Sequence, residues 1–248
     1  MGHYPSPLAT HMSESKKSRL AAHAQRWEEF ANKDPYFYIL TNNDFVYTTE
    51  EGQKRFFDTG EKTCECMLSA VKDLLPSCDQ ALEFGCGIGR LALPHAQRFR
   101  EVIAVDISPT MLRRLSEIAE RSQVRNIKPK LAGENWAPPG TVDYAYSLYV
   151  FQHISEYSVI EDAIKKVAIC LRAEGVAQLQ FDTRPSSLAY RIRNRVPDPL
   201  LPRTWRTAVR RIRRRPEQIR ETLATRGLRI ETEYKPSTRE HTFIVRKI

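Results

Sequence analysis

The sequence has no long apolar run, no paired cysteine motif and no leader-like start. In 248 residues, no stretch approaches the roughly 18 consecutive apolar residues that a membrane span requires. The five cysteines lack the paired CxxC spacing of a structural zinc site, so we expect reduced thiols and no metal. The first residues lack the basic start and apolar core of a signal peptide. These absences favour a cytoplasmic protein over a membrane, zinc-binding or secreted disulfide-bonded one.

One α/β domain with additions accounts for the length of the chain. Residues 1–12 show no apolar periodicity, so we expect a disordered tail or residues left from cloning. Residues 13–75 show helical patterns and are expected to form an N-terminal helical cap. Within this cap, residues 36–40 are predicted to be irregular and aromatic-rich. A helix is predicted over residues 49–75, with Gly60 as a point where it could split.

A glycine-rich turn lies at the centre of the stretch Gln80–Arg90. Its apolar start predicts a buried strand, and the alternate glycines of Gly85–Gly89 let a ligand approach the backbone closely. A dinucleotide fingerprint needs its third glycine three residues after the second, where this sequence has Arg90. Glu83, near the end of the strand, would repel a pyrophosphate and attract an amine. The pattern therefore favours a ligand that carries an ammonium group and a ribose, without phosphate.

Glu83 followed by alternate glycines resembles the first motif of the class I S-adenosylmethionine-dependent methyltransferases. The cap, the stretch Phe56–Gly60 and the residues Val150–His153 together resemble the small-molecule type of this class. Asp106 ends a second β-rich run 19 residues after Gly87, where this resemblance implies an acid that binds the ribose. The resemblance implies an α/β fold for residues 76–248, with a seven-stranded, mostly parallel, doubly wound sheet and a C-terminal antiparallel hairpin. It implies S-adenosyl-L-methionine as cofactor, with Glu134 near the adenine amine. The implied cofactor-binding residues are Glu83, Gly85, Cys86, Gly87, Asp106, Ile107, Met111, Glu134, Asn135 and Ser147.

Open parallel sheets bind ligands at the carboxyl ends of their strands, which here points to the end of the strand predicted over residues 142–150. His153 comes after this strand and is the candidate catalytic residue. It could act as a general base or position the acceptor, and a purely structural role is the third alternative. The resemblance implies that aromatic residues of the cap line the acceptor chamber. The alternative is that they form only the core of the cap. The candidate acceptor-binding residues are Tyr36, Phe56, Phe57, Tyr149, Gln152 and Arg184.

The residues at the end of the fourth predicted strand disfavour two kinds of nucleic acid chemistry. Amino-methylating nucleic acid enzymes have an Asn/Asp-Pro-Pro-aromatic motif there, and this sequence has Ser147–Val150 instead. No Pro-Cys pair comes after the fourth or the fifth predicted strand, so the nucleophile of cytosine C5 methylation is missing.

The positive charge of the chain is concentrated in residues 184–226. This stretch has thirteen arginines, no lysine and three acids, a net charge of +10, and the rest of the chain carries −1. An insertion at about residues 184–215 is predicted, with Arg206, Arg210, Arg213 and Arg214 near one helical face. Arginine suits phosphate, sulfate and carboxylate groups, so an anionic small molecule, an acidic carrier protein, RNA or an anionic membrane surface could bind here. The alternative is a solvated helix face.

Together, these patterns predict methyl transfer from S-adenosylmethionine to an oxygen or nitrogen atom of a small molecule. A natural product or a sugar-containing intermediate is the expected acceptor, an anionic one included. An RNA methyltransferase that uses the arginines is one alternative, and a non-catalytic, methyltransferase-like scaffold subunit is another. The acceptor atom and the oligomeric state do not follow from the sequence.

Overall fold

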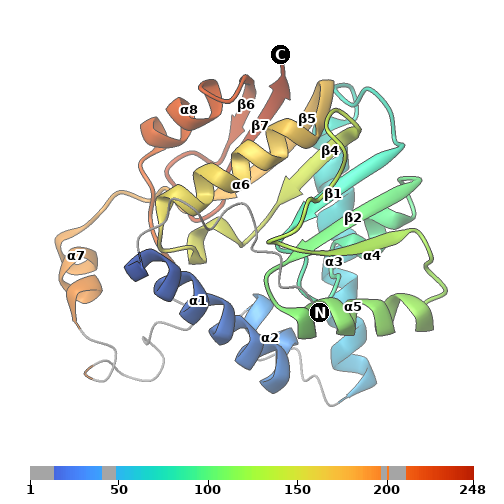
Figure 1. Cartoon of the computed structure of the whole chain (residues 1–248), viewed down its shortest axis with the longest axis horizontal. Coiled ribbons are helices and arrows are strands. Elements are labelled where there is room, and N and C mark those ends of the chain that lie inside the picture. Colours follow the sequence, from blue (N-terminus) through green and yellow to red (C-terminus); the bar gives the residue numbers. More distant parts are fainter. Residues whose placement is uncertain (1–13, 41–48, 197–199, 201–210) are drawn as a thin grey trace.

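The computed structural model describes residues 14–40, 49–196, 200 and 211–248 (Figure 1). Its helices are α1 (Glu14–Lys33), α2 (Pro35–Leu40), α3 (Glu50–Val71), α4 (Ala92–Ala96), α5 (Pro109–Arg121), α6 (Tyr157–Cys170), α7 (Leu188–Arg195) and α8 (Pro216–Ala224). Its strands are β1 (Gln80–Phe84), β2 (Glu101–Asp106), β3 (Ile127–Leu131), β4 (Val142–Ser147), β5 (Leu171–Phe181), β6 (Leu228–Tyr234) and β7 (His241–Lys247). A short 3₁₀ helix comes after β4 at Phe151–His153.

The seven strands form one sheet in the order β3-β2-β1-β4-β5-β7-β6. Strands β1 to β5 are parallel, whereas β7 runs antiparallel to both β5 and β6. Central β1 pairs with β2 and β4, so Phe84, Asp106 and Ser147 end their strands at the same edge. This confirms the predicted mostly parallel sheet with a C-terminal antiparallel hairpin.

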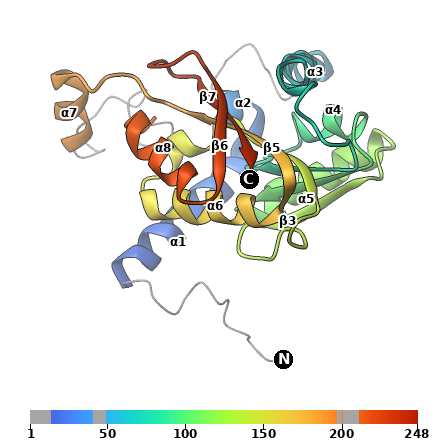
Figure 2. The ribbon, with the colours of Figure 1, turned by 90° about the horizontal axis from the view of Figure 1, so that it is seen from above.

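Apolar side chains fill both faces of the sheet. Leu82 and Phe84 pack on one face with α6 and α8, where Ile164 belongs to the same cluster. Ala81 points to the other face and packs with α3, α4 and α5, and Val71 of α3 belongs to the same cluster. In Figure 1 helix α6 crosses in front of the sheet with α3 behind it, and Figure 2 shows α3 and α6 on opposite sides. Burial on both faces explains why Ala81, Leu82 and Phe84 of β1 are all apolar.

Helix α1 lies against α5 and contacts α2, below α6 in Figure 1. Ala31 and Tyr36 pack there in a small cluster with Phe56 of α3 and Met111 of α5. The last turns of α3 join the sheet cluster through Val71, so this helix covers the sheet as well as the N-terminal helices. The division into a cap at residues 13–75 and a catalytic domain remains a prediction.

Two elements of the N-terminal region differ from the sequence prediction. The segment expected to be irregular is helix α2, because the Asp34 carboxylate accepts a hydrogen bond from Phe37 N at 3.1 Å and Pro35 occupies the first turn. Gly60 does not split α3. A Cβ there would lie 2.0 Å from the carbonyl oxygen of Arg90, so this glycine lets α3 approach the glycine-rich turn.

The arginine-rich segment also differs from the prediction. Helix α7 was not predicted, and it lies outside the sheet and its covering helices (Figures 1 and 2). Arg213 and Arg214 were predicted on a helix, but residues 211–215 form none. The amide of Arg214 bonds instead to Asp182 O at 2.8 Å, and the amide of Ile212 to Gln152 O at 2.7 Å. Arg206, Arg210 and the predicted tail at residues 1–12 lie outside the described residues.

The cysteines all have free thiols, of which Cys64, Cys86 and Cys170 are buried. Among the described residues, no three His, Cys, Asp or Glu side chains are grouped so that they could hold a metal ion. No helix in the described part of the chain is both long and apolar enough to cross a bilayer.

Candidate active site

The turn after β1 packs its backbone directly against neighbouring elements. Gly85 has a φ of +81° and Gly87 a φ of +53°, a region that side chains with a Cβ disfavour. A Cβ on Gly85 would lie 2.2 Å from Val150 Cγ2, and one on Gly87 would lie 2.8 Å from Ile39 Cδ1. Both positions therefore require glycine, and the turn exposes its backbone to the space between β1 and the N-terminal helices.

Asp106 ends β2 beside this turn. Its carboxylate accepts hydrogen bonds from Gly87 N at 2.8 Å and Ser108 N at 2.9 Å, one on each oxygen. Burial raises the pKa of Asp106, and the backbone N–H groups of Ser108 and Gly87 oppose that rise. A carboxylate oxygen has two acceptor sites, so each oxygen retains one for a ligand. Asp106 thus both fixes the turn and offers acceptors to a hydroxyl-bearing ligand.

A cavity of about 230 Å³ opens beside the turn, at the edge of the sheet where β1, β2 and β4 end. Its wall is mostly apolar, with few polar side chains. Seven residues predicted from the sequence line it. Four of them lie in the turn after β1 and at or just beyond the end of β2. These seven are Gly85, Gly87, Asp106, Ile107, Met111, Tyr149 and His153. These residues thus come together around one cavity, and their roles in binding a cofactor or an acceptor stay predictions.

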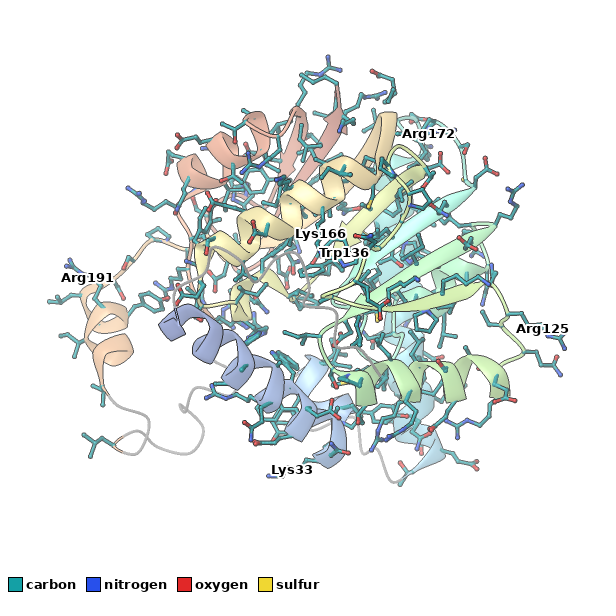
Figure 3. All side chains as sticks on the ribbon, viewed as in Figure 1. Lys33, Arg125, Trp136, Lys166, Arg172 and Arg191 are labelled. Carbon is teal, nitrogen blue, oxygen red and sulfur yellow. The ribbon has the colours of Figure 1, made fainter. Side chains whose placement is uncertain are left out.

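Other lining residues were not predicted: His23, Trp27, Ile39, Trp136, Asp162 and Lys166. The Trp136 ring is 5.2 Å from Phe84, and Lys166 Nζ is 4.7 Å from the Trp136 ring centre, as Figure 3 shows for the labelled pair. Lys166 Nζ also donates to the carbonyl oxygens of Ala132 at 2.9 Å and Glu134 at 3.1 Å. For these additional lining residues, the sequence offered one signal, a tryptophan in the short loop after β3.

Three predicted cofactor residues lie beneath the turn rather than in the cavity wall. Glu83 is buried and accepts a hydrogen bond from Tyr146 Oη at 3.3 Å. Burial raises the pKa of Glu83 well above its usual range, against the opposing effects of the Arg90 charge and the Tyr146 hydroxyl. Cys86 is buried as well, and the Ser147 hydroxyl donates to Phe84 O at 2.9 Å. These residues support the turn from below.

Glu134 and Asn135, predicted near the adenine, are exposed and do not line the cavity. Lys166 holds the carbonyl oxygen of Glu134, while Trp136 turns inward and occupies the wall. Because a short loop can bury only some of its side chains, the apolar indole is the one that turns inward.

The cap aromatics form a core rather than a chamber wall. Tyr36 and Phe56 are buried with their rings 4.9 Å apart, and the rings of Phe56 and Phe57 are 5.2 Å apart. They pack near Ile88 and Met111, and none of the three lines the cavity. Of the two alternatives for these aromatic residues, the structure therefore supports packing in the core of the cap over lining the acceptor chamber.

Arg184 is committed to an internal ion pair. Its guanidinium binds Asp182 through Nε–Oδ1 at 3.0 Å and Nη2–Oδ2 at 2.6 Å. The Asp182 side chain is fully buried, so this pair fixes the chain where it leaves β5. Arg184 therefore lies near the site without lining the cavity.

His153 lies in the cavity wall, in the 3₁₀ helix after β4. Its ring packs edge-on against Trp27, with 5.6 Å between ring centres. Gln152 is buried, and its Nε2 lies 3.2 Å from His153 Nε2. An amide nitrogen can only donate, so His153 Nε2 accepts in this arrangement and Nδ1 carries the proton. A general-base role at Nε2 requires this hydrogen bond to break first.

Glu28 holds α1 against the start of α5. Its carboxylate accepts hydrogen bonds from the hydroxyls of Ser108 and Thr110 and, at 3.2 Å, from Thr110 N. Burial acts to raise the pKa of Glu28, but the hydrogen bonds from Ser108 and Thr110 outweigh it and lower the pKa. A carboxylate at a helix N-terminus also suits the helix dipole. This contact brings His23 and Trp27, on the same helix, into the cavity wall.

The strand order, the glycine-rich turn and the acid at the end of β2 define the class I S-adenosylmethionine-dependent methyltransferases. Residues 81–175 match the family model described as a methyltransferase domain. Over residues 81–175 the chain is therefore similar to a methyltransferase domain, and the fold around this segment is that of the class I enzymes.

Particular relatives show how far the likeness extends. The tRNA/tmRNA (uracil-C(5))-methyltransferase of Pseudoalteromonas atlantica is 27% identical over 112 residues, which are 45% of this chain and 31% of that protein. The matched segment thus spans about a third of that relative. The magnesium protoporphyrin IX methyltransferase of Synechocystis PCC 6803, solved with bound SAH, has a TM-score of 0.61 at 17% identity and covers 90% of this chain and 99% of its own. A geranyl diphosphate methyltransferase has a TM-score of 0.55 at 13% identity, covering 74% of this chain and 78% of its own. These two structures share the fold with this chain.

Proposed function

We propose that this protein transfers a methyl group from S-adenosylmethionine to an oxygen or nitrogen atom of a small-molecule acceptor. The observation that supports this most is the cavity where the glycine-rich turn, Asp106 and His153 meet. A natural product or a sugar-containing intermediate suits its mostly apolar wall. Trp27 closes it on the side of α1, and Tyr149 lies where β4 has ended.

The residues present fit S-adenosylmethionine. Asp106 keeps two acceptor sites for ribose hydroxyls, and the turn at Gly85 and Gly87 leaves room for a ligand against the backbone. Trp136 and Met111 offer apolar surface for a purine. When bound, the cofactor supplies a methyl group on a positively charged sulfur atom.

The chain contributes orientation and exclusion of water more than acid–base chemistry. Holding two reactants in line can lower a barrier by up to about 7–11 kcal/mol. Trp27 and Phe84 enclose the cavity with apolar surface, which limits water. His153, in the cavity wall and beside Gln152, is suited to orient an acceptor.

An RNA acceptor is the second candidate, because curated relatives of the matched segment include tRNA and rRNA methyltransferases. Those relatives are named as uracil-C5 enzymes. Carbon methylation of a pyrimidine ring needs a nucleophile that first adds to the ring, typically a thiolate. All five cysteines are among the described residues, and none lines the cavity. The site therefore favours transfer to oxygen or nitrogen.

Calorimetric titration tests the proposal. We expect S-adenosylmethionine to bind with a micromolar Kd and NAD not to bind, because the alternate glycines lack the spacing of a dinucleotide fingerprint. Acceptor screening would then monitor SAH release with small molecules and, separately, with mixed RNA. Binding of NAD alone would refute the cofactor assignment, and turnover with RNA alone would refute the small-molecule acceptor.

Asp106→Ala tests the proposed cofactor contacts. The variant loses the ribose acceptors and two hydrogen bonds that shape the turn, so we expect S-adenosylmethionine affinity to fall at least about tenfold. Asp58→Ala, on the exposed face of α3, serves as control and should bind normally. Thermal unfolding of each variant distinguishes lost binding from lost structure. A folded Asp106→Ala protein with wild-type affinity would contradict the ribose assignment.

A further inference from the structure

Tyr149 has a strained backbone at the cavity wall. Its φ is +62°, in the left-handed region that residues with a Cβ seldom adopt. Its amide donates to Gln180 Oε1 at 3.0 Å, and Gln180 is itself buried, which fixes the turn. Arg90 Cζ lies 6.0 Å from the ring centre. Strain of this kind persists where the surrounding structure holds a residue in place, often at functional sites.

Residues 211–215 run beside this turn. The amide of Ile212 bonds to Gln152 O and that of Arg214 to Asp182 O, so the segment connects the chain after β4 to the end of β5. We name residues 211–215 the arginine strap. Gln152 directly precedes His153 in the cavity wall, so the strap lies next to the proposed reaction site.

Two arginines of the strap have structural partners. Arg213 stacks on Tyr190, with Cζ 4.1 Å from the ring centre, and donates to Pro185 O. Arg214 Nη2 donates to Ile154 O at 2.6 Å and lies over the Tyr157 ring. Both side chains hold the strap in place.

Arg211 differs from these two. Within the described part of the chain, its side chain forms no hydrogen bond or ion pair, although it is half-buried. Burial lowers the pKa of Arg211, and the charge of Arg239 lowers it further, whereas Asp182 and Tyr149 act in the opposite direction. Asp182 is already bound bidentately by Arg184. A half-buried cation beside a second cation is costly unless an anion binds to it.

Two nearby cations, Lys235 and Arg239, also differ in whether they have an ion-pair partner. Lys235, close to Tyr149, pairs with Glu240 at 2.6 Å. Arg239 lies in the exposed turn between β6 and β7 and has no ion-pair partner among the residues that the structure describes. Among the residues that the structure describes, neither Arg211 nor Arg239 has an ion-pair partner, so both can meet a charge that a ligand supplies.

We propose that Arg211, assisted by Arg239, binds an oxyanion of the methyl acceptor on the Tyr149 side of the cavity. The oxyanion is a phosphate, sulfate or carboxylate group, which the planar guanidinium can bind with two parallel hydrogen bonds. The acceptor then has an anionic end at the strap and its nucleophilic oxygen or nitrogen near His153. This inference rests on the proposed function and specifies the class of its substrate.

Titration of the SAH-loaded protein with pyrophosphate, inorganic phosphate and citrate tests the inference. We expect saturable binding of at least one of them, weakened at least about tenfold in Arg211→Ala and less in Arg211→Lys, which keeps the charge without the fork. Arg239→Ala, in an exposed turn where folding is not at risk, should weaken it severalfold. Arg125→Ala, at an exposed arginine far from the strap (Figure 3), should bind as the wild type does. Stronger binding of pyrophosphate than of citrate would identify a phosphate-bearing acceptor, and the reverse order a carboxylate.

Equal affinity in wild type, Arg211→Ala and Arg239→Ala would overturn the inference, as would a lack of binding by the wild type. SAH affinity is measured on the same samples. If SAH does not bind, the proposed function fails, and the same anion titrations on the unliganded protein still decide the role of Arg211.

Discussion

His153 lies directly beyond the end of β4, with its ring against Trp27 and its Nε2 held by Gln152. We expect His153→Ala to lower turnover at least about tenfold with unchanged S-adenosylmethionine affinity, because it removes an acceptor contact and no cofactor contact. His153→Asn, which keeps an N–H donor near the Nδ1 position, should recover part of the turnover. Steady-state rates and calorimetry on the three proteins measure this.

The pH dependence of turnover distinguishes the two roles of His153. A positioning role predicts that Ala and wild type share the same profile at different heights. If wild-type turnover instead rises with pH and the Ala variant loses that rise, His153 is a base and the positioning role is wrong.

His95 is a fully buried histidine behind the glycine-rich turn. Its Nδ1 lies 2.8 Å from Leu91 O, its ring stacks on Tyr146 with 4.0 Å between centres, and Nε2 has no partner in the described residues. Burial lowers the pKa of His95 from 6.5 to about 4. The unfolded chain therefore takes up a proton below about pH 6.5, while the folded protein takes it up only near pH 4.

Acidification should accordingly destabilise the protein through His95. Between pH 7 and pH 4 this group alone should lower the free energy of unfolding by about 3 kcal/mol. His95→Phe keeps the ring stack and removes the titration, so its stability should fall less over this range. Urea unfolding of both proteins at several pH values measures the difference. Parallel curves for the two proteins would show that His95 does not titrate as its burial implies.

At the residue scale, the site residues that could be predicted are those whose positions depend on a short motif nearby in the sequence. Gly85 and Gly87 are required by backbone angles, and Asp106 by its distance from them, so all three follow from a short motif. Trp136 and Lys166 reach the cavity only because the loop after β3 packs on α6, a contact between distant segments. No pattern within either segment specifies that contact.

At the element scale, one carboxylate joins α1 to the start of α5, beside the apolar contacts of Ala31 and Trp27. Glu28 binds Ser108 and Thr110 at the start of α5, and the same helix supplies His23 and Trp27 to the cavity. Glu28→Ala should loosen α1 by about 1–2 kcal/mol, and SAH should dissociate roughly 5–30-fold faster. Stopped-flow measurement of SAH release and hydrogen exchange of α1 amides test this.

Glu29→Ala is the matched control, because Glu29 lies on the same helix, is exposed and, among the described residues, makes one long contact with Gln25. It should leave both SAH release and α1 exchange unchanged. Identical behaviour of the Glu28 and Glu29 variants would mean that apolar packing alone holds α1.

The predictability of the elements shows the same division between local and distant causes. A serine followed by proline is a typical helix start, and helix α5 begins there, because the Ser108 hydroxyl accepts the amide hydrogen bond of Met111 at 3.1 Å. Gly60 was misread because its cause, the carbonyl of Arg90 against α3, lies thirty residues away. The arginine strap was misread as helix because its amides bond to other segments.

At the scale of the whole molecule, the local net charge of +10 is not a uniform anion-binding surface. Arg184 and Arg220 are bound by Asp182 and Glu233, and Arg213 and Arg214 by carbonyl oxygens and aromatic rings. Arginines with internal partners of this kind contribute to folding rather than to binding a polyanion. The charge count alone therefore overstates the affinity for RNA.

This reasoning predicts weak RNA binding with a shallow salt dependence. Fluorescence anisotropy with a mixed RNA oligonucleotide should give a slope of log K against log salt no steeper than about −3, since a single-stranded contact contributes about −0.7 per phosphate. A slope near −7, the value for about ten phosphates, would mean that most of the thirteen arginines contact RNA. RNA would then be the better candidate acceptor, even though Arg184, Arg213 and Arg214 would have to leave their internal partners on binding.

Arg211→Ala should change the shallow slope by less than about one, since it removes a single contact, while it abolishes most of the binding of a small oxyanion. The two measurements together distinguish a surface that tracks a polymer from a site that holds one anionic group.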